Sequence, residues 1–145
     1  MGQGPQSEIL HATAVADASG RGMVILGPSG AGKSALALQL LALGARLVAD
    51  DRTVLTLDET GGLTLTCPPP IRGLIEARGL GLLRAETIAS ASLALVVDLG
   101  RTETERLPQR REILLLGRPC DLVFGPVTAH FPAALLRYLA WGRLD

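Results

Sequence analysis

Eight consecutive residues near the start of the chain have the composition and spacing of a phosphate-binding loop. Residues 27–34 read GPSGAGKS and match the pattern G-x-x-x-x-G-K-[ST] at every fixed position. Glycines let backbone N–H groups turn toward a phosphate, and the start of the following helix adds partial positive charge. The residues that we expect to bind a nucleotide are Gly27, Pro28, Ser29, Gly30, Ala31, Gly32, Lys33 and Ser34.

Within this loop Lys33 and Ser34 have distinct expected roles. Lys33 would neutralise the β- and γ-phosphates, and the Ser34 hydroxyl would bind Mg²⁺. Lys33 is also the only lysine among the 14 lysine and arginine residues of the chain. A compact ammonium fits between phosphate oxygens better than a planar guanidinium does, so we interpret this lysine as set by phosphate contact.

A nucleotide site also needs a carboxylate for the metal or for the nucleophile, and two strand ends offer one. Asp50 and Asp51 follow an apolar run, and Asp50 lies 17 residues after Lys33. Asp98 ends a second apolar run, which resembles a generic Walker B strand. If one residue of the adjacent pair binds Mg²⁺, its neighbour is available as a base for an incoming hydroxyl. From the pattern alone, each aspartate is equally well explained as a turn or helix-capping residue.

The elements that must position these residues follow from apolar patterning and turn residues. Residues 53–57 and 63–66 flank a glycine pair and predict a hairpin. Residues 71–83 contain three glycines, too many for a helix. The arginine-rich residues 101–111 predict an exposed loop or a mobile flap. Short buried strands are predicted at residues 23–26, 47–49 and 93–97, further strands at residues 113–116 and 122–124, and helices at residues 34–43 and 132–141. We expect one α/β domain over residues 1–145, with residues 1–7 flexible and the phosphate loop between a buried strand and a helix.

Composition limits the classes of function. The formal net charge is zero and aromatic residues make up 3% of the chain, which argues against a nucleic-acid partner or a membrane partner. Two cysteines, 53 residues apart, favour reduced thiols in a cytoplasmic protein over a disulfide scaffold. The start of the sequence shows no signal-peptide pattern.

Four motifs beyond the phosphate loop resemble the catalytic core of bacterial HPr kinase/phosphorylase. Residues 46–52 (RLVADDR) follow the loop and its helix, and residues 75–81 (IEARGLG) resemble the family signature, with Ala77 at an aliphatic position. His11 lies upstream of the loop, about where the family has a functional histidine. Residues 105–108 (ERLP) resemble a further segment, with proline replacing glycine. The resemblance is to a short, alphaproteobacterial-type form without an N-terminal domain.

This resemblance implies a fold and a reaction. The fold would be a P-loop-containing kinase domain with a mixed central sheet. The reaction would be ATP-dependent phosphorylation of a serine on an HPr-like phosphocarrier, which regulates the phosphotransferase system. In reverse, inorganic phosphate would attack the phosphoserine and release pyrophosphate. A homo-oligomer is also expected from the family, although residues 127–145 do not show its substrate-docking segment.

The resemblance also implies roles for individual residues. Asp50 would take the proton from the attacking serine, and His11 would assist it. Asp51 and Glu76 would place Mg²⁺ together with Ser34, and Arg106 would steady the transferring charge.

Two other functions are compatible with the same motifs. The first is a P-loop kinase of small molecules, with residues 101–111 as a lid and Asp98 on the metal side. The second is a module that binds ATP without chemistry. The three readings differ in whether a labelled protein forms and in whether turnover depends on Asp50.

Overall fold

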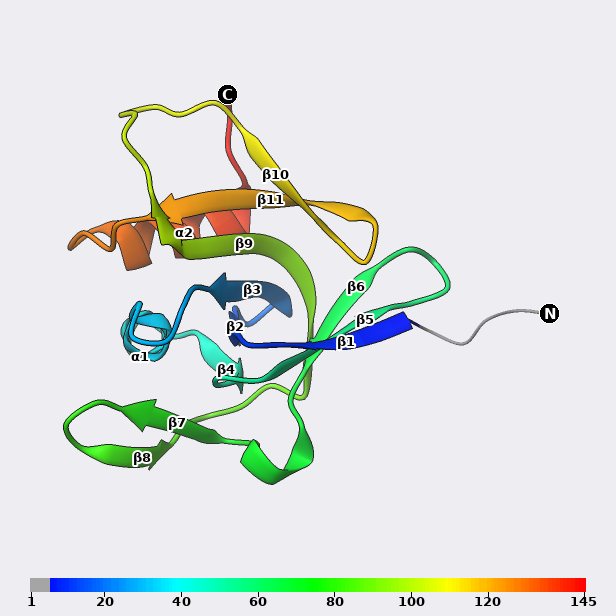
Figure 1. Cartoon of the computed structure of the whole chain (residues 1–145), viewed down its shortest axis with the longest axis vertical. Helices are drawn as coiled ribbons and strands as arrows, with labels where there is room; N and C mark the ends of the chain where they lie inside the picture. Colours follow the sequence, from blue (N-terminus) through cyan, green and yellow to red (C-terminus); the bar gives the residue numbers. More distant parts are fainter. Residues whose placement is uncertain (1–5) are drawn as a thin grey trace.

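The computed structural model describes residues 6–145 as a mixed α/β domain (Figure 1). Of the residues expected to be flexible, residues 1–5 lie outside the described part, and Gln6 and Ser7 pair within the first strand. The strands are β1 (Gln6–Leu10), β2 (Thr13–Ala16), β3 (Arg21–Leu26), β4 (Arg46–Ala49), β5 (Thr53–Leu57), β6 (Leu63–Thr66), β7 (Leu74–Ala77), β8 (Gly81–Arg84), β9 (Ser90–Thr102), β10 (Arg111–Leu115) and β11 (Arg118–Gly125). The helices are α1 (Lys33–Ala42) and α2 (Phe131–Trp141), with a short 3₁₀ segment η1 (Pro69–Ile71).

The main sheet has the mixed character that the sequence predicts. Its strand order is β1-β5-β6-β9-β3-β2-β4, and β11 also pairs with β9 while β10 extends from β11. The pairs β3–β9 and β9–β11 are parallel, whereas β2 pairs with both β3 and β4 in antiparallel fashion. The long strand β9 curves through the molecule and joins the β5–β6 hairpin to strands β3 and β11 (Figure 1).

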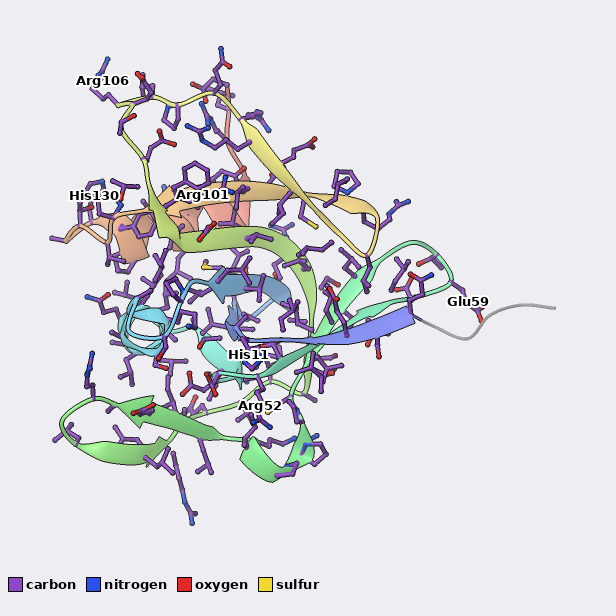
Figure 2. The ribbon with its side chains drawn as sticks, viewed as in Figure 1. His11, Arg52, Glu59, Arg101, Arg106 and His130 are labelled. Carbon is purple, nitrogen blue, oxygen red and sulfur yellow. The ribbon has the colours of Figure 1, made fainter. Side chains whose placement is uncertain are left out.

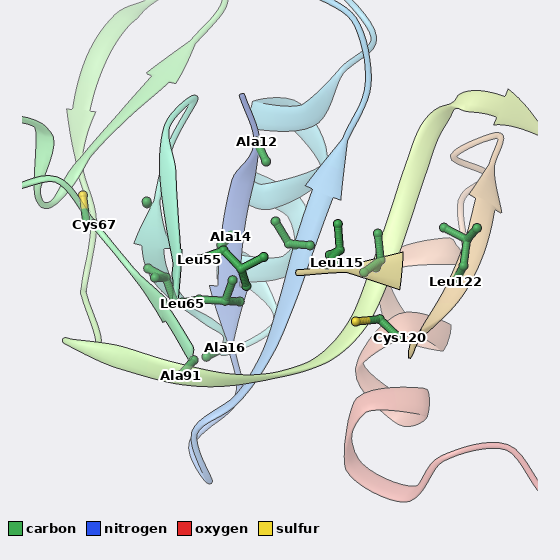
Figure 3. Packing of buried hydrophobic residues seen from close by; sticks show 14 residues of the cluster. Ala12, Ala14, Ala16, Leu55, Leu65, Cys67, Ala91, Leu115, Cys120 and Leu122 are labelled. Carbon is green, nitrogen blue, oxygen red and sulfur yellow. The ribbon is translucent and has the colours of Figure 1, made fainter. Parts of the chain in front are cut away.

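The central strands are buried on both faces, which explains their continuous apolar runs. Along β3, Met23 and Ile25 face one cluster, which includes Leu36 and Leu40 of α1 and Leu135 of α2. The intervening residues of the central strands contribute to a second cluster on the opposite face (Figure 3). That cluster contains Ala14, Val24, Val48, Leu55, Leu65, Val96 and Leu122 among others.

Helix α1 begins and ends where its flanking glycines require. Gly32 is the N-cap, and its φ of 97° is a left-handed backbone conformation that residues other than glycine rarely adopt. At the other end the Gly44 N–H donates to the Leu41 carbonyl and the Ala45 N–H to the Leu40 carbonyl. This paired arrangement is a Schellman motif, which ends the helix before Gly44, close to the predicted end at residue 43.

The β7–β8 hairpin forms a separate two-stranded sheet below the main sheet (Figure 1). It occupies the glycine-rich segment for which no helix was expected. The exposed loop predicted for residues 101–111 is shorter in the structure: β9 continues through Thr102 and β10 begins at Arg111. The strand predicted at residues 113–116 ends at Leu115, because Leu116 has φ 47° and belongs to the β10–β11 turn.

Both cysteines are buried and free. Burial raises the pKa of the Cys67 thiol and of the Cys120 thiol. Across residues 6–145, neither α1 nor α2 has the length and apolar character that a membrane crossing requires.

Candidate functional site

The glycine-rich loop, residues 27–32, connects β3 to α1. It follows the carboxyl end of β3, which runs parallel to β9 with Leu26 opposite Asp98. Gly27 has φ 151°, and a Cβ atom placed there would lie 3.1 Å from the Ala31 Cβ. A side chain at Gly27 would therefore crowd the loop, and the N-cap residue Gly32 has no side chain with which to cap the N–H groups at the start of α1.

The Lys33 side chain lies over this loop. Its Nζ donates hydrogen bonds to the Gly27 carbonyl at 2.7 Å and to the Pro28 carbonyl at 3.3 Å. These contacts hold the only lysine of the chain against the backbone of the glycine-rich loop.

Asp50 lies at the end of β4, and protein donors occupy both of its carboxylate oxygens. Its Oδ1 accepts hydrogen bonds from the Ser34 hydroxyl at 2.6 Å and from the Thr13 hydroxyl at 2.9 Å. Its Oδ2 accepts one from the Glu76 N–H at 2.8 Å. The residue is only 7% exposed. Asp50 thus links α1, β2 and β7 from a buried position.

Asp51 has the opposite environment. Its side chain is exposed and lines the cleft beside the glycine-rich loop. Its backbone adopts φ 68°, a left-handed conformation that aspartate tolerates better than most residues. The Asp51 N–H donates to the Thr13 hydroxyl at 3.3 Å, which helps to hold this turn. Of the two adjacent carboxylates, Asp51 is therefore the one that a substrate can reach.

The cleft has a volume of about 780 Å³ and lies between the glycine-rich loop, the exposed face of α1 and the β7–β8 hairpin. It brings together the sequence-predicted residues 29–34, Asp51 and Glu76. Arg78 and Leu80 of the hairpin segment and Val127 also line it. Parts of the two sequence motifs, residues 29–34 and residues 76–78 with Leu80, thus line one cleft although they lie more than 40 positions apart in the sequence.

The residues of the cleft fit a Mg²⁺ ion bound together with a nucleotide. Because Ser34 donates its hydroxyl hydrogen to Asp50, the lone pairs of its oxygen remain available to a metal. Mg²⁺ usually keeps several waters and takes one or two carboxylates along with substrate phosphates. Asp51 and Glu76 offer such carboxylates. Within residues 6–145 no three His, Cys, Asp or Glu side chains are grouped so that they could hold a metal ion by themselves.

His11 lies beside Arg52, the residue after Asp51, and does not line the cleft. β1 and β5 are antiparallel, and Leu10 at the end of β1 pairs with Thr53 at the start of β5. His11, which follows Leu10, and Arg52, which precedes Thr53, are therefore neighbours (Figure 2). The His11 side chain is exposed.

Arg106 and Asp98 are not among the residues that line the cleft. Arg106 is exposed in the loop between β9 and β10, at the outer edge of the molecule (Figure 2). Asp98 lies next to the glycine-rich loop, but its carboxylate accepts the Gly100 N–H at 2.8 Å and lies 3.6 Å from the Arg101 guanidinium. Its contacts are with its own turn, whereas Asp50 contacts Ser34 directly.

The base of the loop that carries Arg106 is firmly held. Two nitrogens of the Arg111 guanidinium donate to the Glu103 carboxylate at 3.1 Å each. The same guanidinium lies 4.5 Å from the centre of the Phe124 ring. The hydrogen bond from Arg111 holds the pKa of Glu103 below its ordinary value. Both ends of the loop, residues 103–110, are therefore fixed to β10 and β11.

Sequence reasoning missed Thr13, whose hydroxyl contacts both aspartates. Thr13 is fully buried at the start of β2. β2 pairs with β4 through Ala14 and Ala49, which places Thr13 opposite Asp50. A threonine in an apolar strand carries no signal of this role, and only the β2–β4 pairing reveals it.

Comparisons with known proteins agree on one relationship. The family described as "HPr Serine kinase C-terminal domain" matches residues 5–112 of this chain. The HPr kinase/phosphorylase of Aromatoleum aromaticum is 40% identical over 133 residues, which cover 83% of this chain and 42% of that protein. That of Bordetella pertussis is 42% identical over 132 residues, covering 83% and 43%. The chain thus spans about two fifths of the length of these relatives.

A solved structure shows the same fold. The Hpr(Ser) kinase/phosphatase from Coxiella burnetii superposes with a TM-score of 0.74, covering 90% of this chain and 86% of that one. The two sequences are 23% identical.

Proposed function

This chain belongs to the family of HPr serine kinase C-terminal domains, and from that premise we propose that it is an ATP-dependent protein serine kinase acting on an HPr-like phosphocarrier. The observation that carries the proposal is the cleft itself. A glycine-rich loop with Lys33 and Ser34 faces two carboxylates, Asp51 and Glu76, across a space open to the surface. This is the arrangement that phosphoryl transfer needs: positioning, charge neutralisation and one base near the nucleophile.

The glycine-rich loop would bind the phosphates of ATP through its backbone N–H groups and Lys33. Mg²⁺ held by Ser34 and Glu76 would neutralise charge on the β- and γ-phosphates. The buried Asp50 would hold the Ser34 hydroxyl so that its lone pairs face the cleft. In this arrangement Asp50 acts on the metal side of the site.

The division of roles between the aspartates therefore differs from the one that the sequence resemblance implies. A general base must come within hydrogen-bond reach of the proton that it removes. Asp50 already accepts three hydrogen bonds and is buried, whereas Asp51 is exposed in the cleft. We assign the proton acceptor to Asp51 and the positioning of Ser34 to Asp50.

In the forward direction the serine oxygen of the phosphocarrier attacks the γ-phosphorus, and the bond to the leaving ADP oxygen breaks. Asp51 accepts the serine proton. In the reverse direction an oxygen of inorganic phosphate attacks the phosphoserine phosphorus, the serine oxygen leaves with a proton from Asp51, and pyrophosphate forms. His11 lies beside Arg52 and does not line the cleft, and its assisting role rests on the sequence resemblance. For Arg106 the sequence resemblance is the only support.

The geometry disfavours a small-molecule kinase that uses Asp98 on the metal side. The Asp98 carboxylate is held by its own turn and by Arg101. Asp50, in contrast, reaches the helix that follows the glycine-rich loop.

The test is transfer of label from [γ-³²P]ATP to an HPr-like phosphocarrier in the presence of Mg²⁺. We expect acid-stable phosphoserine, and none on a phosphocarrier whose acceptor serine is replaced by alanine. When this protein and inorganic phosphate are added to the purified phosphorylated phosphocarrier, pyrophosphate should be released. ATP consumption that labels a metabolite and no protein would refute the proposal. Nucleotide binding without any turnover would refute it as well.

A further inference from the structure

One buried hydroxyl touches both members of the aspartate pair. The Thr13 Oγ1 donates to the Asp50 carboxylate at 2.9 Å and accepts the Asp51 N–H at 3.3 Å. A threonine hydroxyl has a single hydrogen to donate and two lone pairs to accept with. The Asp51 N–H can only donate, so it uses a lone pair of this oxygen, and the single hydroxyl hydrogen is donated to the Asp50 carboxylate. The direction of both hydrogen bonds is thereby fixed.

The hydrogen bonds continue from Thr13 to the glycine-rich loop. The oxygen of Asp50 that accepts from Thr13 is the same Oδ1 that accepts from Ser34 at 2.6 Å. The path Thr13–Asp50–Ser34 therefore runs from β2 through the end of β4 to α1. A second branch runs from Thr13 to the backbone of Asp51 in the cleft.

We propose that Thr13 is a positioning residue that sets the metal side and the proton-accepting side of the site together. Through Asp50 it orients the Ser34 hydroxyl toward Mg²⁺, and through the Asp51 N–H it holds the left-handed turn that presents Asp51 to the cleft. This inference rests on the proposed function for the roles of Ser34 and Asp51, and it goes further in naming the group that couples them.

Thr13 is built to stay in place. It is 0% exposed and lies in β2, which pairs with β3 on one side and β4 on the other. The preceding residue, Ala12, is tied to the far side of the aspartate turn, because the Thr53 hydroxyl donates to the Ala12 carbonyl at 2.9 Å. The chain thus has two buried threonines at one turn, of which only Thr13 touches the aspartates.

This pair supplies a matched experiment. Thr13→Val keeps the side-chain shape and the strand preference but removes the hydroxyl, and Thr13→Ser restores a hydroxyl. Thr53→Val removes an equally buried hydroxyl from the same turn without touching Asp50 or Asp51. For each variant we would measure the affinity for the fluorescent nucleotide mant-ADP as Mg²⁺ is titrated, and in EDTA as the metal-free reference. Transfer of label to the phosphocarrier would be measured in parallel.

Thr13→Val should raise the half-saturating Mg²⁺ concentration roughly tenfold, since outer-shell partners of metal ligands have effects of that order. It should also lower kcat while leaving mant-ADP affinity in EDTA unchanged. Thr13→Ser and Thr53→Val should stay within about twofold of the wild type in the same titration. An unchanged Mg²⁺ requirement in Thr13→Val would overturn the inference, and so would an equal rise in Thr53→Val.

The two hypotheses fail in different ways. A wild-type protein that shows Mg²⁺-dependent mant-ADP binding but labels no phosphocarrier refutes the proposed function. The Mg²⁺ titration of the threonine variants then still decides the role of Thr13 on the metal side.

Discussion

The sharpest test of the site is to neutralise the two adjacent aspartates one at a time. Asp51→Asn keeps the size of the side chain and removes the proton acceptor. Asparagine also tolerates the left-handed backbone found there, at φ 68°. Because Asp51 is exposed, its substitution should change the free energy of unfolding by less than about 0.5 kcal/mol. A positioned base contributes roughly 10²- to 10⁴-fold to rate, or about 3–5 kcal/mol of activation free energy.

Asp50→Asn should act on stability as well as on rate. Three donors surround this carboxylate, so the new amide NH₂ must face at least one of them. A lost hydrogen bond to a charged group, with a donor left unpaired, costs about 2–3 kcal/mol. For a domain of this size that corresponds to a fall in melting temperature of about 5–10 °C. We also expect the Mg²⁺ requirement for nucleotide binding to rise, since Ser34 loses its orienting acceptor.

The assay combines thermal unfolding with single-turnover transfer of label from ATP to the phosphocarrier at saturating Mg²⁺. Glu59→Gln serves as the control, because it removes one negative charge from the exposed β5–β6 turn, away from the cleft (Figure 2). If Asp51→Asn transfers phosphate at the wild-type rate while a folded Asp50→Asn is inactive, the proposed roles of the two aspartates are reversed. If both variants keep the wild-type rate, neither is the base.

Two further predictions address the loop and the far side of the fold. Lys33→Ala should weaken nucleotide binding by roughly 10²-fold, and Lys33→Arg should not restore it because a guanidinium does not fit between the phosphates. Titration with mant-ADP measures the affinity of both variants. Wild-type affinity in Lys33→Ala would show that the glycine-rich loop is not the phosphate-binding site. Tyr138, the only tyrosine, should ionise above its ordinary pKa, because burial and then the hydrogen bond to Asp121 both raise that pKa. The folded protein favours the neutral Tyr138 phenol, which adds to the free energy of unfolding at pH values below the pKa of tyrosine in the unfolded chain. This stabilisation is lost as the pH rises through the higher pKa of Tyr138 in the folded protein. Absorbance at 295 nm follows the titration, and Asp121→Asn should lower the midpoint only partly, because burial is the larger cause.

The sequence predicts the secondary-structure elements of the site better than it predicts the separate roles of Asp50 and Asp51 within it. Helix α1 and the strand before the glycine-rich loop follow from local apolar patterning and glycine caps, which depend on near neighbours. The partners of Asp50 are not local: they lie 16, 26 and 37 residues away along the chain. The curvature of β9 and its extension through Thr102 also depend on tertiary pairing, since β9 pairs with β6, β3 and β11 along its length. Burial and partner choice at residues 50 and 51 therefore emerge only once β2, β4 and β7 are assembled.

The assembled fold also explains why two carboxylates in direct sequence serve different functions. Successive side chains of a strand point to opposite faces, so a continuous strand through Asp50 and Asp51 would turn one of them away from the other. Here β4 ends at Ala49, and the left-handed turn at Asp51 redirects the chain. Asp50 stays among buried donors, while Asp51 reaches the cleft. Phosphoryl transfer needs a carboxylate on the metal side and a base near the nucleophile, a short distance apart. A strand end with a single strained residue provides both within one turn, at a cost of about 1–3 kcal/mol that the hydrogen bonds of Thr13 and Asp50 offset.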